Sequence, residues 1–322
     1  MKAIRIHEFG GPEVLKYEES PSPAPGQGQA LIDVQAVGVN FADVSARRGG
    51  AIPPPSLPTT PGFEAAGVIS AVGDGVGDVK VGDTVAYWGV RGSYAEQVAV
   101  PADVLVKIPQ GLDAKMGAAV YLQGMTAHYL AFTTYPLKPG DFALVHAGAG
   151  GTGLLLIQMA KRAGAYVFAT VSTEEKAALA MEAGADKAII YTREDFVEEV
   201  NKTTDGQGCQ AVYDSVGQTT FENSLNCLAR RGCLALYGQS SGPVPPVAPA
   251  NLRGSSFLTR PSLVDHTANR EELEWRAGEV FNWVASGDLK VRIGGEFPLA
   301  EAAEAHRQLE GRLSTGKLLL IP

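Results

Sequence analysis

A glycine-rich segment at residues 146–165, HAGAGGTGLLLIQMAKRAGA, has the residue types and spacing of a phosphate-binding loop. Gly148, Gly150 and Gly153 form G-x-G-x-x-G between an apolar run and a helix-like run. In this context the first glycine makes the turn, the second lets the backbone approach a pyrophosphate, and the third lets helix and strand pack closely. A tight turn without ligand is the alternative. The strand-helix series that follows favours a dinucleotide, and the predicted loop comprises Gly148, Ala149, Gly150, Gly151, Thr152 and Gly153.

The next predicted strand, AYVFATVS, indicates which dinucleotide binds. NAD sites place Asp or Glu near the end of this strand, where the carboxylate binds the adenosine ribose. Here the strand ends in Thr-Val-Ser at 170–172, and Glu174 and Glu175 fit the cap of the following helix instead. Ser172 and Lys176 suit a 2′-phosphate by hydrogen bond and by charge, although Lys176 alone also fits a solvated helix surface. We therefore predict NADPH as the cofactor.

Strands and helices alternate around this loop from about residue 123 onward. Apolar runs predict strands at 142–148, 165–172, 187–191, 209–217, 233–239 and 255–260, with helices at 151–164, 173–185, 193–204 and 219–232. Continuous apolar strands separated by helices are typical of a parallel sheet with helices on both faces. The fold class is therefore α/β, with a Rossmann doubly wound parallel sheet.

The rest of the chain does not show this alternation of strands and helices. Short apolar runs broken by Gly and Pro predict a β-rich domain up to about residue 122. Two helical stretches, 270–287 and 299–312, and a final strand at 317–322 are too short for a third domain. We expect this tail to return to the first domain. The predicted domains are then 1–122 with 262–322, and an inserted nucleotide-binding domain at 123–261.

The composition and charge of the chain disfavour nucleic acids and membranes as partners. The 322 residues include 27 basic and 35 acidic side chains, a net charge of −8, which disfavours nucleic acid and anionic lipid as partners. No apolar stretch approaches the ~20 residues that span a bilayer, and the segment 1–11 reads as a short strand rather than a signal peptide. Three cysteines without a C-x-x-C pair predict buried thiols. We expect a cytoplasmic protein without membrane or nucleic-acid partners.

Nine segments in order carry a resemblance over nearly the whole chain: HEFGGPEVL, VGVNFADV, PGFEAAGVI, VGDTVAY, GSYAEQ, QGMTAHYL, HAGAGGTGLLLIQMAK, YDSVG and LTRPSL. Together they resemble the quinone oxidoreductase (zeta-crystallin) branch of the medium-chain dehydrogenase/reductase superfamily. The run 146–161 is specific to this branch. The resemblance implies a GroES-like β-rich catalytic domain beside the Rossmann domain, with the active cleft between them. It also implies a homodimer that pairs edge strands, for which 255–260 is the candidate.

The zinc-dependent alcohol dehydrogenases form the other large branch of that superfamily, and this chain departs from them. Asn40 and Phe41 stand where those enzymes carry a ligand cysteine, and Gly62, Phe63 and Glu64 replace their Gly-His-Glu. The four-cysteine structural zinc loop is absent from the sequence. Because phenylalanine cannot bind zinc, we predict an enzyme without a metal. Structural roles are expected for the scattered histidines His7, His128 and His146.

By the same resemblance, several residues line the cofactor in three groups. Asn40 and Thr126 are expected at the nicotinamide, where they orient the ring and do not act as acid or base. Ser172, Lys176 and Tyr191 are expected at the adenosine phosphate. The ends of later strands contribute Ser215, Tyr237, Gly238, Gln239 and Ser240. Arg260, Arg312 and Lys317 are candidates for closing over the cofactor, and surface salt bridges fit them equally well.

One departure bears on the substrate. Bacterial quinone reductases carry tyrosines shortly after the Asn-Phe pair, whereas this chain has ADVSARRGGAIPPP, with Ser45 and Ala51 or Ile52 near those places. A less aromatic pocket follows. The leading function is zinc-independent hydride transfer from NADPH to quinones. An enone or enoyl reductase is the alternative, and a crystallin-like cofactor-binding protein with little turnover is an alternative of another class.

The variant Lys176→Ala tests the predicted 2′-phosphate contact. We expect kcat/KM with NADPH to fall roughly tenfold relative to kcat/KM with NADH, because only NADPH carries the phosphate that the ammonium neutralises. Initial rates with each cofactor, followed by the loss of nicotinamide absorbance, give this ratio. An unchanged preference would contradict the assignment.

Overall fold

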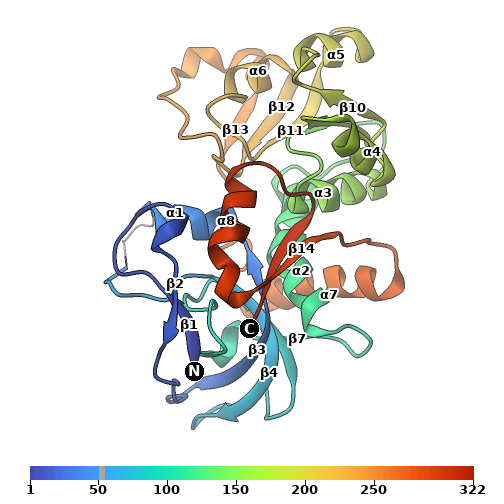
Figure 1. The fold of residues 1–322 in the computed structure, drawn as a ribbon. Helices are drawn as coiled ribbons and strands as arrows, with labels where there is room; N and C mark the ends of the chain where they lie inside the picture. The colour runs from blue at the N-terminus through green and yellow to red at the C-terminus, as the bar shows by residue number, and fades with distance from the viewer. Residues whose placement is uncertain (51–54) are drawn as a thin grey trace. The chain divides into compact units, whose positions relative to one another are not determined.

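The computed structural model describes residues 1–50 and 55–322 and divides the chain into two compact units, coloured along the chain in Figure 1. The first unit comprises residues 1–122 with 269–322, and the second comprises 123–268. The expected second boundary at 261 therefore differs from the observed division at 268. The intervening segment stays with the second unit, where His266 stacks on Tyr129 with ring centroids 4.4 Å apart.

The first unit is built on a seven-stranded sheet. Its strand order is β14-β15-β3-β4-β5-β7, with β6 also paired to β3. The strands are β3 (Gln29–Val39), β4 (Glu64–Val72), β5 (Thr84–Trp88), β6 (Gln97–Pro101), β7 (Val106–Lys107), β14 (Ile293–Pro298) and β15 (Lys317–Ile321). A separate hairpin pairs β1 (Lys2–Arg5) with β2 (Lys16–Glu19). The last strand, β15, runs antiparallel to β3, so the chain's tail is part of the first sheet, as the sequence suggested.

Four helices accompany this sheet. They are α1 (Phe41–Arg47), α2 (Ala114–Tyr129, which crosses the unit boundary), α7 (Arg270–Ser286) and α8 (Ala302–Glu310). Leu273, Ala277, Val280 and Phe281 of α7 are buried and share one face of the helix, whereas Val284 is only half-buried. Phe281 stacks on Tyr121 of α2 with ring centroids 5.7 Å apart, so the apolar face of α7 is covered within the unit.

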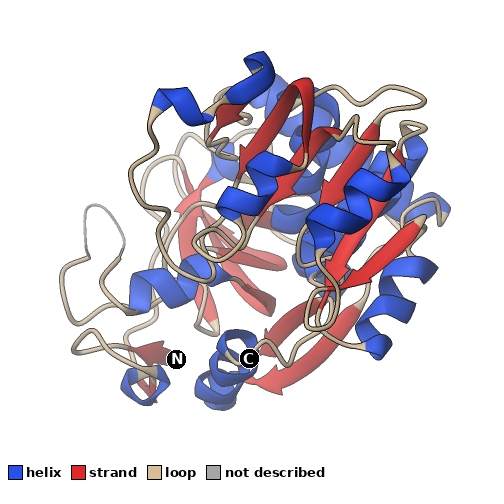
Figure 2. Ribbon diagram, turned by 90° about the horizontal axis from the view of Figure 1, so that it is seen from above, coloured by secondary structure: helices blue, strands red, loops and turns tan. Residues whose placement is uncertain are grey.

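The second unit is a six-stranded parallel sheet in the order β10-β9-β8-β11-β12-β13. Its strands are β8 (Phe142–Val145), β9 (Tyr166–Val171), β10 (Lys187–Ile190), β11 (Cys209–Asp214), β12 (Leu228–Leu236) and β13 (Phe257–Thr259). Its helices are α3 (Gly151–Arg162), α4 (Glu174–Glu182), α5 (Phe196–Thr203) and α6 (Phe221–Asn226). In chain order this is 3-2-1-4-5-6, the Rossmann strand order, and Figure 2 shows its strands in red and its helices in blue.

One predicted element is wrong. The helix expected at 219–232 ends at Asn226, and β12 begins at Leu228. The backbone N–H of Cys209 donates to the carbonyl of Cys227 at 2.7 Å, and Leu228 is the parallel partner of Cys209. The sheet therefore captures this segment before the helix can continue. The predicted edge strand is confirmed as β13, at the end of the sheet order. Within the part of the chain that the structure describes, no helix has both the length and the apolar character needed to cross a bilayer.

Candidate functional site

The glycine loop joins β8 to α3, with Gly150 as the helix N-cap. A Cβ on Gly153 would lie 2.3 Å from the carbonyl oxygen of Ala147, and one on Gly148 would lie 2.8 Å from the Cβ of Ala169. Gly153 and Gly148 are therefore needed for close packing. Around Gly150 the nearest atom would be 3.2 Å away, which leaves its surroundings the most open of the three.

The turn itself differs from the sequence expectation. It lies at Ala147, whose φ is +53°, rather than at Gly148, whose φ is not positive. The carbonyl of Ala147 accepts the N–H of Gly150 at 2.9 Å. No acidic side chain lies in the first turn of α3, so the positive end of its helix dipole is not neutralised from within the helix. This N-terminus suits an anion such as a pyrophosphate.

His146 connects the ends of three neighbouring strands. Its Nδ1 lies 2.9 Å from Oγ1 of Thr170 at the end of β9, and its Nε2 lies 3.0 Å from Oγ of Ser224. Ser224 donates its proton to Oδ2 of Asp214, the last residue of β11, at 2.9 Å. The Ser224 oxygen must therefore accept from Nε2–H, and Nδ1 must accept from Thr170. Burial lowers the pKa of His146, which is consistent with this neutral form.

Asp214 also shapes the loop that holds Ser215. Its Oδ1 accepts the N–H groups of Val216 at 2.8 Å and Gly217 at 2.9 Å. The sequence predicts a role for the serine of the motif DSVG, whereas the structure shows that the aspartate fixes the turn. A carboxylate followed by Ser-x-Gly at a strand end is the signal that could have identified it.

The predicted residues after β11 and β12 come together in the second unit. The N–H of Ser240 donates to the carbonyl of Ser215 at 3.1 Å, and a Cβ on Gly238 would lie 2.6 Å from that same oxygen. Gln239 is exposed beside them. Tyr237 is half-exposed, and desolvation raises the pKa of its phenol to about 12, so the hydroxyl remains protonated. The loop after β11 and the loop after β12 therefore contact each other at the carboxyl end of the sheet.

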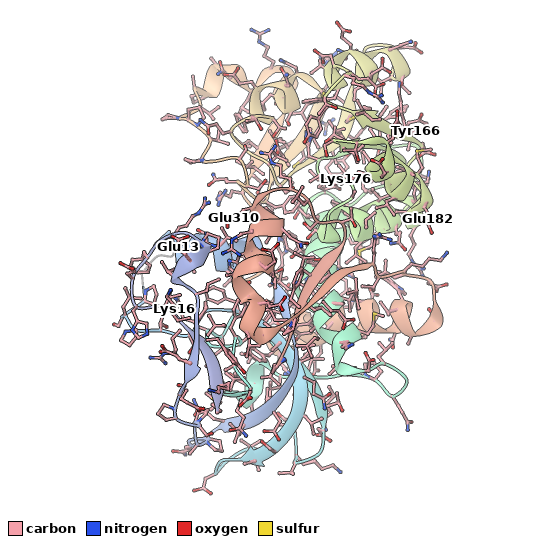
Figure 3. All side chains as sticks on the ribbon, viewed as in Figure 1. Glu13, Lys16, Tyr166, Lys176, Glu182 and Glu310 are labelled. Carbon is pink, nitrogen blue, oxygen red and sulfur yellow. The ribbon has the colours of Figure 1, made fainter. Side chains whose placement is uncertain are left out.

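The residues expected at the adenosine phosphate also adjoin one another. The backbone N–H of Tyr191 donates to the carbonyl of Val171 at 3.1 Å, and Thr192 donates to the carbonyl of Ser172 at 3.1 Å. Lys176, labelled in Figure 3, lies in the first turn of α4. The glutamates expected at the start of α4 do lie in its first turn, but the N-cap is Thr173, whose side chain accepts the N–H of Lys176. No carboxylate ends strand β9 itself.

In the first unit, Asn40 lies between β3 and α1 within a buried polar cluster. Its Oδ1 accepts from the ammonium of Lys317 at 2.8 Å. Its Nδ2 donates to the carbonyl of Gly38 at 3.1 Å and to Oε2 of Glu64 at 2.9 Å. These contacts fix the plane of the amide. The Asn40 side chain is therefore oriented before any ligand arrives.

Glu64 and Lys317 form the centre of this cluster. The ammonium lies 2.6 Å from Oε2 of Glu64, and the two side chains are 0% and 1% exposed. The other carboxylate oxygen accepts the N–H of Leu122 at 2.7 Å. A Cβ on Gly38 would lie 2.1 Å from Glu64 Oε2, so only glycine fits beneath the pair. Lys317 is a predicted candidate for closing over the cofactor, but in the structure its buried ammonium binds Glu64 and Asn40 instead.

A second buried network continues from α1 to α8. Arg47 donates to Nδ1 of His306 at 3.0 Å and binds the Glu310 carboxylate, which is labelled in Figure 3. Nε2 of His306 lies 2.8 Å from the hydroxyl of Tyr94, which donates to Oδ2 of Asp43 at 3.2 Å. Arginine donates to Nδ1, so Nε2 carries the imidazole proton. The sequence did not reveal this network, because its members are far apart along the chain.

Burial controls protonation in this second network. Desolvation raises the pKa of Asp43 to about 7, although the N–H of Asn40 donates to its Oδ2 at 2.8 Å. Desolvation and the charge of Arg47 lower the pKa of His306 to about 3. At neutral pH the histidine is uncharged. The positive charge of Arg47 is paired with the carboxylate of Glu310.

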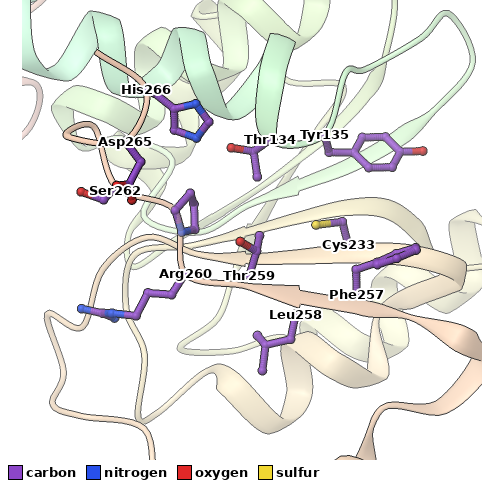
Figure 4. A pocket seen from close by; sticks show the side chains of 11 residues that line it. Thr134, Tyr135, Cys233, Phe257, Leu258, Thr259, Arg260, Ser262, Asp265 and His266 are labelled. Atoms are coloured by element: carbon purple, nitrogen blue, oxygen red, sulfur yellow. The ribbon is translucent and has the colours of Figure 1, made fainter. Parts of the chain in front are cut away.

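The remaining predicted residues are distributed between the units. Thr126 is 8% exposed on α2 within the second unit, whereas Asn40 belongs to the first. Arg312 lies just after α8 in the first unit. Arg260 lines a pocket of about 540 Å³ at β13 together with Ser262, Asp265 and His266 (Figure 4). Ser45 is exposed on α1, and Ala51 and Ile52 lie outside the described residues.

The metal ligands of zinc dehydrogenases have no counterpart in the geometry of the described residues. Phe63 precedes Glu64 at the start of β4, and its ring lies beneath Arg91. The three cysteines are buried free thiols. Among residues 1–50 and 55–322, no group of three or more His, Cys, Asp or Glu side chains could hold a metal ion.

Comparisons with known proteins cover the whole chain. A model of the alcohol dehydrogenase GroES-like domain matches residues 26–110, and one of the zinc-binding dehydrogenases matches 151–277. The chain is 43% identical to the quinone oxidoreductase of Pseudomonas aeruginosa, covering 100% of this chain and 99% of that protein. It is 42% identical to a 2-haloacrylate reductase from a Burkholderia species, covering 99% and 98%. The structure of Escherichia coli quinone oxidoreductase complexed with NADPH matches with a TM-score of 0.97 at 42% identity, covering all of both chains.

The buried Glu64–Lys317 pair yields a prediction about stability. Lys317→Met leaves an uncompensated carboxylate in the interior, so we expect the free energy of unfolding to fall by about 3–5 kcal/mol. The double variant Glu64→Gln/Lys317→Met removes both charges, and we expect it to regain part of that loss. Urea unfolding of the purified protein measures both values.

The matched control is Lys115→Met, which breaks an ion pair with Glu296 on the surface of the same unit. We expect a much smaller change there, because water screens the exposed pair. Equal losses for Lys317→Met and Lys115→Met would contradict a special role for the buried pair.

Proposed function

This chain belongs to the quinone oxidoreductase branch of the medium-chain dehydrogenase/reductase superfamily, and from that membership we propose that it transfers hydride from NADPH to quinones without zinc. The observation that carries this proposal is the full-length identity of 43% to a named quinone oxidoreductase. NADPH supplies the hydride, and the protein's task is to bind and orient the reactants. Accordingly we assign no side chain as nucleophile, acid or base.

The second unit contains the groups that would hold NADPH. The N-terminus of α3 and the open surroundings of Gly150 suit the pyrophosphate. Ser172, Lys176 and Tyr191 suit the adenosine 2′-phosphate, because they offer a hydroxyl, a cation and a ring at the ends of β9 and β10. The absence of a carboxylate at the end of β9 supports NADPH over NADH. The adjoining loops that carry Ser215 and residues 237–240 would bind the rest of the cofactor.

Asn40 and Thr126 are the proposed orienting residues at the nicotinamide. The fixed amide of Asn40 supports this role, since a hydrogen-bonding group that is already oriented costs less entropy on binding. Glu64 and Lys317 would then act as positioning residues, through Asn40. Arg260 and Arg312 remain proposals for closing over the cofactor.

A second candidate function is reduction of an activated C=C bond. The 2-haloacrylate reductase relative, at 42% identity over 99% of this chain, favours it. Replacement of an aromatic residue by Ser45 in α1 also fits a pocket that is less specific for flat quinone rings. The third reading, a crystallin-like protein that binds NADPH with little turnover, shares the same cofactor site.

The assembly and location of the protein are also proposals. Strand β13 ends the parallel sheet, and Phe257 on it is 60% exposed. An edge strand with an exposed aromatic residue is commonly covered by a partner, so we propose a homodimer formed through β13. We also propose a cytoplasmic protein, and its net charge of −8 disfavours nucleic acid as a partner.

Analytical ultracentrifugation is expected to give a molar mass of about twice the 33.8 kDa of one chain. Phe257→Lys should shift the protein toward monomer, because it places a charge on the covered edge. Leu313→Lys, which also adds a lysine at an exposed apolar position but in the first unit, should not. A wild-type protein that sediments as a monomer would refute this assembly.

The function itself is tested by NADPH oxidation with a panel of quinones and a panel of enones, repeated with NADH. We expect quinones to consume NADPH and NADH to support much slower turnover. Turnover with enones alone would replace the leading function with the second. Tight NADPH binding without turnover of any acceptor would favour the crystallin-like reading.

A further inference from the structure

Arg91 stacks on Phe63 in the first unit, with its guanidinium carbon 5.1 Å from the ring centroid. The loop that carries Arg91 follows β5 and is bonded to the backbone around Phe63. Gly89 donates its N–H to the carbonyl of Phe63 at 2.8 Å, and Gly92 donates to the carbonyl of Gly62 at 2.9 Å. The stacked position of Arg91 is therefore supported by the backbone on both sides.

The charge of Arg91 is not neutralised by the protein. Within residues 1–50 and 55–322, no hydrogen bond or ion pair involves its guanidinium, and its stacking on Phe63 is the contact that the structure shows. By contrast, Arg47 in the same unit is paired with Glu310. Arg91 is only half-exposed, and burial lowers its pKa below the ordinary value for arginine. A partly desolvated cation whose donors are unused costs free energy, which a bound anion would recover.

The ring on which Arg91 stacks belongs to the residue next to Glu64, a hydrogen-bond partner of the proposed orienting residue Asn40. Phe63 immediately precedes Glu64, whose carboxylate accepts from the amide of Asn40 at 2.9 Å. Phe63 and Glu64, adjacent in the chain where β4 begins, therefore connect Arg91 to Asn40. A guanidinium fork suits planar or tripodal oxyanions, and the ring below it restricts its orientation.

We propose that Arg91 is a specificity-determining residue that binds an anionic group, a carboxylate or sulfonate, on the electron acceptor. The acceptor class is then an anionic quinone or enoate rather than a neutral one. The net charge of −8 repels such acceptors at long range, so a local cation is needed for their recognition. This inference rests on the proposed NADPH-dependent reduction of quinones or activated C=C bonds.

The test compares 1,4-naphthoquinone with 1,4-naphthoquinone-2-sulfonate as acceptors, using wild type, Arg91→Gln, Arg91→Lys and Phe63→Leu. We expect Arg91→Gln to lower kcat/KM for the sulfonate by about ten- to a hundredfold and to change kcat/KM for the neutral quinone little. Arg91→Lys should restore part of the loss, because the charge returns without the planar fork. Phe63→Leu keeps the arginine but removes its platform, so it should give a smaller selective loss. Intrinsic differences in quinone reactivity cancel when variant and wild type are compared.

Arg307→Gln is the control for the loss of one positive charge, because Arg307 is exposed on α8 in the same unit. It should leave the ratio of the two acceptors unchanged. An equal loss for both quinones in Arg91→Gln, or no loss, would overturn the proposal. A weaker NADPH affinity in Arg91→Gln, measured by direct titration, would also overturn it, because Arg91 would then belong to the cofactor. If the wild type reduces neither quinone nor any enone, the proposed function has failed rather than the assignment of Arg91.

Discussion

The buried ion pair between Glu64 and Lys317 is the contact on which the first unit depends. Two charges removed from water are stable only when their attraction and further hydrogen bonds offset the lost hydration. Here Asn40, the N–H of Leu122 and the neighbouring ammonium satisfy the carboxylate. The pair joins the start of β4 to the start of β15 at the end of the chain. The C-terminal strand must therefore return to the first sheet for the cluster around Asn40 to exist.

The second unit satisfies a buried carboxylate with hydrogen bonds alone, without a neighbouring cation among the described residues. The hydrogen bonds from Thr170 to His146, from His146 to Ser224 and from Ser224 to Asp214 run in one direction and end on a carboxylate. Each donor is used once, and a protonated His146 would disrupt the order. Strand ends in a parallel sheet meet along one edge, and this chain of bonds links three of them through Ser224 of α6.

Polar groups in the two units therefore divide into those that hold the structure and those that remain unused. His306 links Arg47 to Tyr94, and Tyr94 donates to Asp43 in the interior of the first unit. Arg91 differs, because its stacking on Phe63 leaves its hydrogen-bond donors unused by the described residues. Arg91 carries a full charge, so its unused donors cost more free energy than an unpaired hydroxyl does, and a bound anion would recover that cost.

The sequence by itself determined the fold class, the glycine loop, the start of α4 and the edge position of the last Rossmann strand. These features depend on local periodicity and on spacings of a few residues, which a linear sequence displays directly. Only the tertiary structure decided the partners of Lys317, which lies 253 residues from Glu64 and 277 from Asn40. It also decided that the helix after residue 219 stops at Asn226, because pairing with Cys209 outweighs local helix propensity. Whether a charged side chain is solvated or buried depends on which distant strands meet, and no local pattern in the sequence encodes that.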